Sequence, residues 1–369
     1  MDEGPVTVWC LLGKKAGDNT QVRALSAELG YGCVEKNIAA RAGELLVHLG
    51  PAATLAGIRL EASSPLQAPG PDLVITAGRR NEPVALWIRK QSGGRTRLVH
   101  IGRPWAPLSS WDLLITTPQY FLPEQPNVLH NTLPLHRACG DELDSAGRAL
   151  LPRIGHLPRP RIAVLAGGDS GRFVMTADKG GRLGALASRL AEAAGGSLLV
   201  TDSPRTPRDA GDAMQSRLRG PHFCYRWTDG SDNPYRGFLA LADAFVVTGE
   251  SMSMLGEAAD TGRPLFIFDM GDGDTPWWRL AHGWRYKPLS HRCAMRFGPR
   301  RMRRDIGRIQ DALVESGRAR WLDPATLDTA AGSLQQVDDA AAKEVERGGV
   351  AVAELRRSAE AVRRLVIPR

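Results

Sequence analysis

Short apolar runs recur along the first 135 residues, and each run ends in glycine or a polar turn. The runs are VTVWCLLG, DLVITAGRR, RLVHIGRP, WDLLITTP and NVLHNT. Stretches with the spacing of amphipathic helices, such as NTQVRALSAEL and EPVALWIRKQ, lie between some of them. Strands that are apolar on both faces and alternate with helices are typical of a parallel sheet with helices on both sides. The pattern therefore predicts a doubly wound, Rossmann-like α/β domain over residues 1–152.

The same alternation starts again after PRIGHLPRP, residues 152–160, a stretch rich in Pro, Gly and Arg that has the composition of a linker. The strand-like runs that follow are RIAVLAGG, SLLVTDSPRTP, HFCYRW, AFVVTGE and PLFIFD. They predict a second Rossmann-like domain over residues 160–310, followed by helices over residues 311–369, part of which is expected to pack back on the first domain. The expected architecture is two such domains that face each other across a cleft, with ligands beyond the carboxyl ends of the strands.

The composition of the chain indicates what charge its ligand carries and in which cellular compartment it works. The 369 residues are 43% hydrophobic, enough for a large core, and carry a formal net charge of +8 that arginine dominates. Guanidinium groups bind phosphate and carboxylate bidentately, so this charge favours an anionic ligand. The five cysteines are widely spaced and form no CxxC pair, so neither a disulfide framework nor a zinc site is expected. A reducing cytoplasm fits this use of cysteine.

No segment of the chain is predicted to cross a membrane. The N-terminus lacks the basic start and long apolar region of a secretory signal. Nowhere do about 18 apolar residues follow one another, which is the length that a membrane-spanning helix needs. Any membrane contact is therefore expected to be peripheral.

The segment TGESMSMLGE interrupts the second strand series with carboxylates and hydroxyls. A strand AFVVTG followed by a helix SMSMLGEAADTG would place Glu250, Ser251 and Ser253 at the helix N-terminus. Free backbone N–H groups and the helix dipole favour an anion there, such as a diphosphate. Glu257, four residues after Ser253, lies near the same face and could accept hydrogen bonds from ribose or sugar hydroxyls. A capped helix with early carboxylates accounts for the same residues, and this simpler interpretation is favoured locally.

Two further loops follow strands of the second series. TDSPRTP offers Ser203, Arg205 and Thr206, and an arginine beside hydroxyls can clamp a phosphate; a proline-rich turn with an exposed arginine is the alternative. AGGDSGRF contains Gly167 and Gly168, whose backbone N–H groups can approach a ligand closely. This loop lacks the GK[ST] ending of a P-loop, so ATPase chemistry is not expected.

In the first domain, LGKKAGDNTQ joins the first strand to a helix. Lys14, Lys15 and Asp18 are expected to point toward the cleft, with Asp18 as a candidate general base. Asp18 or Asn19 as a helix N-cap is the simpler explanation. AGRRN supplies Arg79 and Arg80 after another strand, either as ligand contacts or as solvated charges.

Other patterns carry weaker signals. Asp272 and Asp274 form an Asp-x-Asp that could hold Mg²⁺ or Mn²⁺, although a flexible glycine-rich loop is the commoner explanation. Trp277 and Trp278, followed by seven arginines between 292 and 308, fit an anionic membrane surface or a domain junction with a solvated basic helix. The eight histidines show no zinc-ligand spacing, and no GxSxG elbow occurs.

Taken in order, these loops resemble one known family. LGKKAGDNTQ, ITAGRRNEPVA, NVLHNTLPLHR, IAVLAGGDSGRF, LLVTDSPRTP and NPYRGFLALADAFVVTGESMSMLGEAADTGRP are similar to segments of the plant elongated-mitochondria fission factors and their bacterial relatives. The resemblance covers roughly residues 6–270, and the segment from NPY to GRP is long enough to be specific. Those relatives are regarded as glycosyltransferases of the GT-B type, so the resemblance implies this fold and a sugar-transfer activity.

A second resemblance implies roles for individual residues. Glu257, Gly262 and Pro264 have the spacing found in the nucleotide-sugar half of GT-B enzymes, such as the transferase that completes the lipid-linked peptidoglycan precursor. In that pattern the glutamate binds the ribose of the donor. The preceding helix N-terminus, here Ser251 and Ser253, faces the diphosphate.

The chain departs from the fission-factor pattern at two positions. Glu250 stands where that family usually has aspartate, and Pro204 stands where a second arginine is common. These departures leave open which donor is used and whether activity is retained.

GT-B enzymes usually need no bound metal, because helix dipoles and basic side chains stabilise the departing nucleoside diphosphate. The resemblance therefore implies no metal and no cofactor besides the nucleotide-diphosphate-sugar donor, and it weakens the case for the Asp-x-Asp. It also places the acceptor on the N-terminal domain. Asp18 and Lys14 are then the catalytic candidates, with Arg79 and Arg80 on the acceptor side.

The leading hypothesis is a cytoplasmic, metal-independent GT-B glycosyltransferase that moves a sugar from a nucleotide donor to a cell-envelope or lipid-linked acceptor at the inner face of the membrane. Nucleic acid is not an expected partner. Two alternatives remain open. One is a non-catalytic GT-B-like scaffold or adaptor, as the plant members' recruitment of fission machinery suggests, and the other is a nucleotide-sugar epimerase of the same two-domain build.

Overall fold

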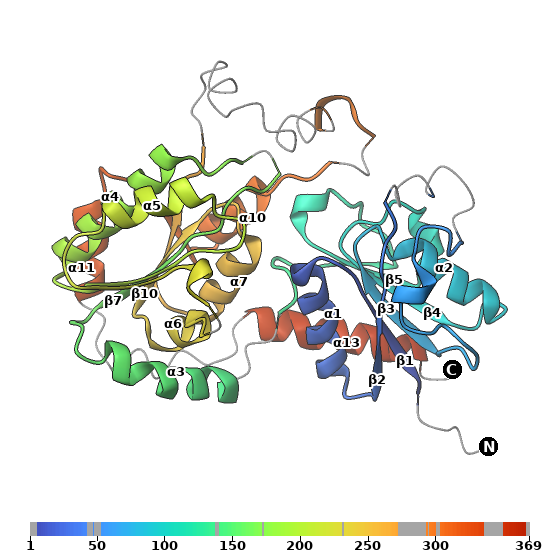
Figure 1. The fold of residues 1–369 in the computed structure, drawn as a ribbon. Coiled ribbons are helices and arrows are strands. Elements are labelled where there is room, and N and C mark those ends of the chain that lie inside the picture. Colours follow the sequence, from blue (N-terminus) through green and yellow to red (C-terminus); the bar gives the residue numbers. More distant parts are fainter. Residues whose placement is uncertain are drawn as a thin grey trace. The chain divides into compact units, whose positions relative to one another are not determined.

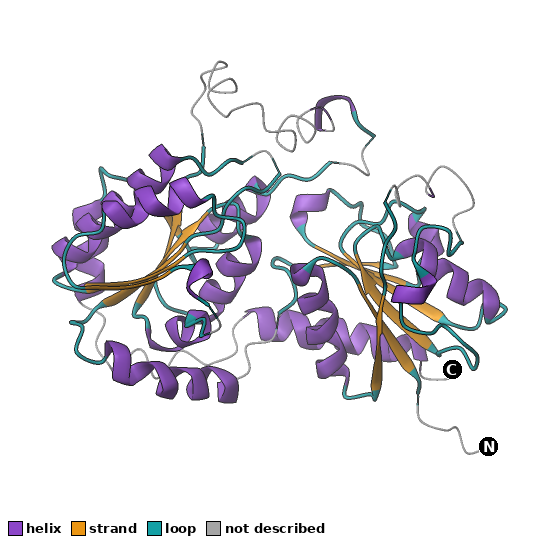
Figure 2. Cartoon of the chain, viewed as in Figure 1, coloured by secondary structure: helices purple, strands orange, loops and turns teal. Residues whose placement is uncertain are grey.

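A computed structural model describes residues 6–42, 47, 53–136, 140–171, 173–230, 232–271, 293, 295–299, 303–335 and 350–366 of the chain. The chain divides into two compact units (Figure 1). Unit 1 comprises Met1–Arg137, Gly298–Asp305 and Val350–Arg369, and unit 2 comprises Ala138–Phe297 and Ile306–Gly349. Each unit is built on one parallel sheet with helices on both faces, as Figure 2 shows. The predicted fold class, two Rossmann-like α/β domains, is confirmed at this level.

Unit 1 holds a six-stranded parallel sheet of strand order β2-β1-β3-β4-β5-β6. The strands are β1 (Val8–Leu12), β2 (Cys33–Asn37), β3 (Leu73–Ala77), β4 (Arg97–Ile101), β5 (Leu113–Thr116) and β6 (Val128–His130). The helices are α1 (Ala16–Leu29), α2 (Glu82–Gln91) and α13 (Val350–Val366), with short 3₁₀ helices η2 (Leu60–Ala62), η3 (Leu108–Ser110) and η4 (Pro118–Tyr120). The strand order reverses direction between β1 and β3. Ligands bind at such a switch point in open parallel sheets, outside the carboxyl ends of the strands.

The alternation of residues along β1 explains why both faces of this sheet are apolar. Cys10 and Leu12 point to the face that α1 and α13 cover, whereas Trp9 and Leu11 point to the face that α2 covers. Successive side chains of a strand alternate between faces, so a fully apolar strand needs a helix on each side. The two helical layers therefore bury every residue of β1.

The helix α13 comes from the far end of the chain and completes the core of unit 1. Leu355, Ala359 and Val362 lie on one helical face and pack into the core that β1 and α1 form. A side-chain hydrogen bond reinforces the contact, because Asn131 Nδ2 donates to Ser358 Oγ at 3.0 Å. In Figure 1, α13 lies beside α1.

The strand β2 was not among the predicted strands. Its sequence CVEKN has no buried residue, so the apolar run that marked the other strands is missing. β2 pairs with β1, and a disulfide joins Cys33 to Cys10. The spacing of the cysteines in the sequence did not predict this bond. The two cysteines are 23 residues apart in sequence, and only the sheet brings them together.

Unit 2 holds a second six-stranded parallel sheet, of strand order β12-β11-β10-β7-β8-β9. The strands are β7 (Arg161–Leu165), β8 (Ser197–Thr201), β9 (His222–Tyr225), β10 (Ala244–Thr248), β11 (Leu265–Phe268) and β12 (Arg320–Trp321). The helices are α3 (Gly140–Ile154), α4 (Ala177–Ala194), α5 (Arg208–Ser216), η5 (Trp227–Asp229), α6 (Tyr235–Leu241), α7 (Met252–Asp260), α10 (Gly307–Glu315) and α11 (Leu327–Gln335). In this sheet the switch point lies between β7 and β10.

The division between the units differs from the predicted boundary at residues 152–160. α3 lies before that boundary in sequence but belongs to unit 2, where it packs against α6. The two helices are close enough that a Cβ on Gly237 would lie 2.7 Å from the Leu150 side chain. Arg236 also forms an ion pair with Glu142. The linker-like composition therefore marks the turn between α3 and β7 instead of the junction of the units.

Candidate functional site

Three loops meet at the carboxyl edge of the second sheet, beside its switch point. They follow β7, β8 and β10, and Gly167 lies at their centre. Its backbone N–H donates to Thr248 Oγ1 at 2.8 Å, and its carbonyl accepts a hydrogen bond from Ser203 Oγ at 2.9 Å. The Thr206 hydroxyl donates to the same carbonyl. Side chains from two neighbouring strand ends thus hold the loop after β7 in place.

The loop after β7 can approach its neighbours only because its residues are glycines. A Cβ on Gly167 would lie 1.8 Å from Glu250 Oε1, and a Cβ on Gly168 would lie 2.1 Å from the Arg205 carbonyl oxygen. Neither position has room for any side chain. The sequence interpretation of these glycines as points of close backbone approach fits this geometry.

Glu250 holds the loop after β7 through a hydrogen bond to Gly168. Its side chain is buried, and Oε1 accepts a hydrogen bond from the Gly168 N–H at 2.6 Å. Arg205 Nη2 lies 3.8 Å from the same oxygen. Burial raises the pKa of the carboxyl above its ordinary value, although Arg205 opposes this shift. Glu250 was expected at the N-terminus of the following helix, but α7 begins at Met252, and Glu250 instead faces the glycine loop.

Positive charge gathers at the N-terminus of α7. Ser251 is the N-cap residue, but its side chain makes no capping hydrogen bond. Instead, Ser251 Oγ accepts a hydrogen bond from Arg205 Nη2 at 3.3 Å, which holds the guanidinium at the positive end of the helix dipole. The Arg205 side chain is 40% exposed, and Ser253 in the first turn is also exposed. This end of α7 therefore combines a helix dipole, a guanidinium and a hydroxyl, a combination that favours an anion.

Glu257 lies in the next turn of α7 and is half-buried. The Tyr235 hydroxyl donates a hydrogen bond to Glu257 Oε2. Burial, together with this carboxylate, raises the pKa of Tyr235 well above its ordinary value, so the phenol keeps its proton and remains a donor. Tyr235 was not a candidate from the sequence, although it stands in the NPYRGF segment that carried the family resemblance.

A second site lies in unit 1, where a pocket opens at the switch point between β1 and β3. The pocket contains all four residues that the sequence suggested for this domain, Lys14, Asp18, Arg79 and Arg80. The remaining lining residues are Gly13, Lys15, Ala77, Gly78 and Asn81. Residues from two loops that are about 60 positions apart thus form one cationic pocket.

Asp18 lies close to both loops. Gly78 has a φ of +74°, and a Cβ there would lie 2.5 Å from Asp18 Oδ2, so only glycine fits beside this carboxylate. The expected N-cap role of Asp18 or Asn19 is wrong, because α1 begins at Ala16 and both residues lie inside its first turns. The Asn19 side chain instead bonds to the backbone of Gly13, accepting from its N–H at 2.9 Å and donating to its carbonyl at 2.8 Å.

Lys15, which the sequence also placed toward the cleft, belongs to this pocket. Its Nζ lies 3.9 Å from Asp18 Oδ2. Asp18 favours the charged lysine, but burial of part of the side chain and the nearby guanidinium groups of Arg304, Arg79 and Arg80 outweigh it, so the pKa of Lys15 is lowered. The direction of this shift shows how much positive charge surrounds the pocket.

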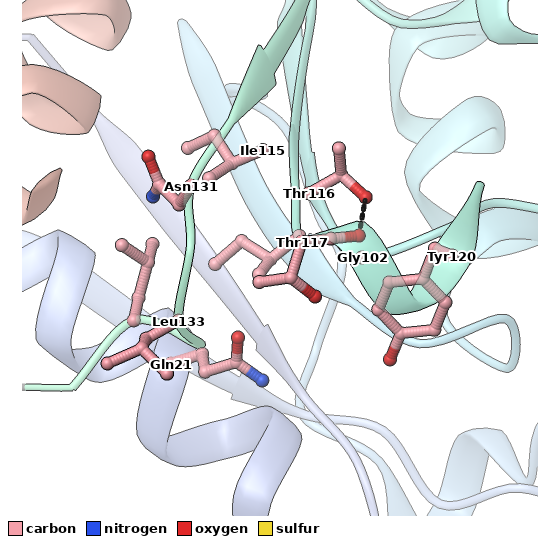
Figure 3. A pocket seen from close by; sticks show the side chains of 10 residues that line it. Gln21, Gly102, Ile115, Thr116, Thr117, Tyr120, Asn131 and Leu133 are labelled. Atoms are coloured by element: carbon pink, nitrogen blue, oxygen red, sulfur yellow. Dashed lines mark hydrogen bonds between the residues drawn. The ribbon is translucent and has the colours of Figure 1, made fainter. Parts of the chain in front are cut away.

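A smaller pocket lies along the same edge of the first sheet, at the ends of β4, β5 and β6 (Figure 3). Gln21 from α1, Tyr120 from η4 and Asn131 after β6 line it together with threonine and aliphatic side chains. Figure 3 shows the Thr116 hydroxyl bonded to the Thr117 carbonyl oxygen. No motif in the sequence pointed to this pocket, because its residues come from four separate segments.

Several sequence candidates lie outside the described residues. They are Asp272, Asp274, Trp277 and Trp278, together with Arg292, Arg300 and Arg301 of the arginine-rich stretch 292–308. Within the described ranges, no group of three or more His, Cys, Asp or Glu side chains could hold a metal ion. No helix in these ranges is both long and apolar enough to span a bilayer.

Solved structures show which fold this chain has. A Listeria monocytogenes protein, provisionally described as a UDP-N-acetylglucosamine 2-epimerase, superposes with a TM-score of 0.57 at 12% identity, covering 98% of this chain and 96% of its own. The glycotransferase of kitacinnamycin superposes with a TM-score of 0.52 at 15% identity, covering 99% of this chain and all of its own. The two parallel sheets with their helices therefore form a GT-B fold, which glycosyltransferases and epimerases share.

The sequence identifies the family within that class. The family model described as mitochondrial fission ELM1 matches residues 16–348, and the chain belongs to this family. Mitochondrial fission protein ELM1 of Arabidopsis thaliana is 29% identical over 221 residues, which are 54% of this chain and 51% of the plant protein. The match thus spans about half the length of that relative. The resemblance to the plant fission factors and their bacterial relatives is confirmed.

Proposed function

We propose that the protein is a GT-B glycosyltransferase that transfers a sugar from a nucleotide-diphosphate donor to a cell-envelope or lipid-linked acceptor. The observation that carries this proposal is the convergence of three loops and the N-terminus of α7 at the switch point of the second sheet. This is where an open parallel sheet binds its ligand, and the groups gathered there favour a diphosphate.

In this proposal, different residues of unit 2 bind the diphosphate and the ribose of the donor. Arg205, Ser251 and the first N–H groups of α7 bind the diphosphate, with the loop at Gly167 and Gly168 beside it. Glu257 accepts hydrogen bonds from the ribose hydroxyls, and Tyr235 orients its carboxylate. Glu250 does not touch the donor; it holds the glycine loop in position.

The chemistry needs no metal in this proposal. A base takes the proton of the acceptor hydroxyl, the oxygen attacks the anomeric carbon, and the bond from that carbon to the diphosphate breaks. The departing diphosphate gains negative charge, which the α7 dipole and Arg205 stabilise because they are already in place. In unit 1, Asp18 is the candidate base, and Lys14, Arg79 and Arg80 contact the acceptor.

A titration of the full chain with UDP and with GDP tests the donor site. We expect one of them to bind and Glu257→Ala to weaken that binding by about 1–3 kcal/mol, the cost of leaving polar groups without a partner. Glu192→Ala is the matched control, because Glu192 is an exposed carboxylate on α4 of the same unit. If neither nucleotide binds, or if Glu257→Ala binds as tightly as the control, the proposal fails.

An epimerase is the second candidate function, because the Listeria protein with the same fold carries that description. Incubation with a UDP-sugar in the absence of any acceptor separates the two activities. An isomerised sugar in the product would favour epimerisation, whereas unchanged UDP-sugar that is consumed only when an acceptor is added favours transfer. A non-catalytic scaffold would bind no nucleotide in the titration above.

A further inference from the structure

The cationic pocket of unit 1 has a charge that the donor site does not explain, since the proposed diphosphate lies in unit 2. Four cationic side chains line it, Lys14, Lys15, Arg79 and Arg80, against the single carboxylate of Asp18. Cationic side chains from two loops therefore line one concave site, and such a site favours an anion.

The backbone adds to this field. Both α1 and α2 begin at the pocket, with N-cap residues Lys15 and Asn81, and neither residue caps its helix through its side chain. The first N–H groups of two helices and their positive dipole ends are thus directed to one place. The acidic residue at the start of α2, Glu82, is not among the residues that line the pocket. It is fully buried, and its carboxylate accepts hydrogen bonds from the N–H groups of Trp105 and Ala106 at 2.8–2.9 Å.

The pocket is open to solvent, which suits an anion that carries a further group. Lys14 and Lys15 at its edge are exposed, so a group attached to the anion can extend outward. Small residues, among them Gly13, Ala77 and Gly78, form the remaining wall and leave the centre open. Arg79 is held in place by the Trp105 ring, with its guanidinium carbon 4.6 Å from the ring centroid. A guanidinium held in this way is suited to bidentate binding of a phosphate.

We propose that this pocket binds the phosphate group of a phosphate ester. Lys14 and Lys15 from the loop after β1 and Arg79 and Arg80 from the loop after β3 contact the phosphate oxygens. The Asp18 carboxylate lies between these two loops, close to Gly78 and 3.9 Å from Lys15 Nζ. That the ester is the sugar acceptor rests on the proposed function, whereas the binding of phosphate does not.

Calorimetric titration of the full chain with glucose 1-phosphate, and with glucose as the uncharged control, tests the pocket. The variants are Lys14→Gln and Arg80→Gln. Lys90→Gln is the matched control, because Lys90 is an exposed lysine at the other end of α2. We expect glucose 1-phosphate to bind the wild type and glucose not to bind. Each pocket variant should bind about tenfold more weakly, the effect of losing one charged hydrogen bond, while Lys90→Gln matches the wild type.

A phosphate ester can be a soluble compound or part of a lipid. A second experiment therefore measures binding of the protein to vesicles that contain phosphatidic acid, with phosphatidylcholine vesicles as the comparison. Binding of the phosphatidic acid vesicles that falls in Lys14→Gln and Arg80→Gln but not in Lys90→Gln supports the proposal with a lipid as the source. If neither probe binds the wild type, or if the pocket variants and the control lose the same affinity, the proposal is overturned. Should UDP fail to bind while glucose 1-phosphate binding depends on Lys14, the proposed function fails and the phosphate pocket stands.

Discussion

At the scale of single residues, two adjacent glycines shape the candidate donor site. Gly167 and Gly168 let the loop after β7 lie against Glu250 on one side and the Arg205 carbonyl on the other. No other residue type fits, because any Cβ would overlap these atoms. The close approach brings Arg205 and Ser251 to the same point, and it depends on residues that have no side chain.

Gly168→Ala should therefore disturb both the fold and the binding of nucleotide. The added Cβ would lie 2.1 Å from the Arg205 carbonyl oxygen, and relief of such overlap costs about 1–3 kcal/mol of the free energy of unfolding. Urea unfolding measures this loss, and a UDP titration of the folded variant measures the weakened site. Gly332→Ala in α11 is the control. A Cβ there meets nothing within 4 Å, so this variant should gain up to about 1 kcal/mol. Equal stability of the two variants would refute this account of the loop.

A buried histidine makes the stability of unit 1 depend on pH. His100 on β4 is fully buried, and its ring packs 4.8 Å from the Trp111 ring. Burial lowers the pKa of His100 to about 4, against partial compensation by backbone groups of Gly102 and Gly78. In the unfolded chain the pKa of His100 keeps its ordinary value of 6.5. Between pH 6.5 and pH 4 the unfolded chain therefore binds a proton on this ring that the folded chain does not bind. His100 thus contributes stability above pH 6.5 that is lost as the pH falls toward 4.

His100→Asn should flatten this part of the pH profile. A shift of this size corresponds to roughly 3 kcal/mol of unfolding free energy between pH 6.5 and 4 in the wild type. The variant lacks the titrating ring, so its loss over the same range should be smaller by about that amount. Urea unfolding at several pH values measures both slopes. His222→Asn, at an exposed position on β9, should keep the wild-type slope. Parallel profiles for His100→Asn and the wild type would contradict the assignment.

At the scale of elements, the sequence predicted those strands that are apolar on both faces. The runs at β1, β3, β4, β5 and β6 were found this way, as were β7 to β11. β2 and β12 escaped detection, because β2 has no buried residue and the two residues of β12 are exposed. β2 pairs with β1 and β12 pairs with β11, so backbone hydrogen bonds define both strands. The pattern of apolar side chains does not predict such bonds.

The sequence predicts where a helix occurs more readily than which sheet the helix packs against. The spacing of Leu355, Ala359 and Val362 marks an apolar helical face, but nothing in it tells which sheet that face covers. The answer lies in contacts such as that of Glu354, whose carboxylate accepts from the Thr132 N–H at 2.7 Å. The same limit applies to α3, which joins unit 2 although it precedes the linker-like segment. Long-range partners, which a local pattern does not contain, decide both cases.

At the scale of the whole molecule, one rule of parallel sheets placed most of the candidate residues. Loops after neighbouring strands meet at the carboxyl edge, so Gly167, Ser203 and Ser251 could be grouped from the sequence alone. The orientation of Glu250 could not be, because it depends on the space that two glycines leave. The partner of Glu257 could not be predicted either, since Tyr235 reaches it from a separate helix.

The central claim is that the switch point of the second sheet binds a nucleotide diphosphate. A crystal structure of the full chain soaked with UDP tests it most directly. The account predicts density for the diphosphate at the N-terminus of α7, within hydrogen-bonding distance of Ser251 and Arg205, and for the ribose at Glu257. UDP bound elsewhere, or no density at this position under saturating UDP, would contradict the claim.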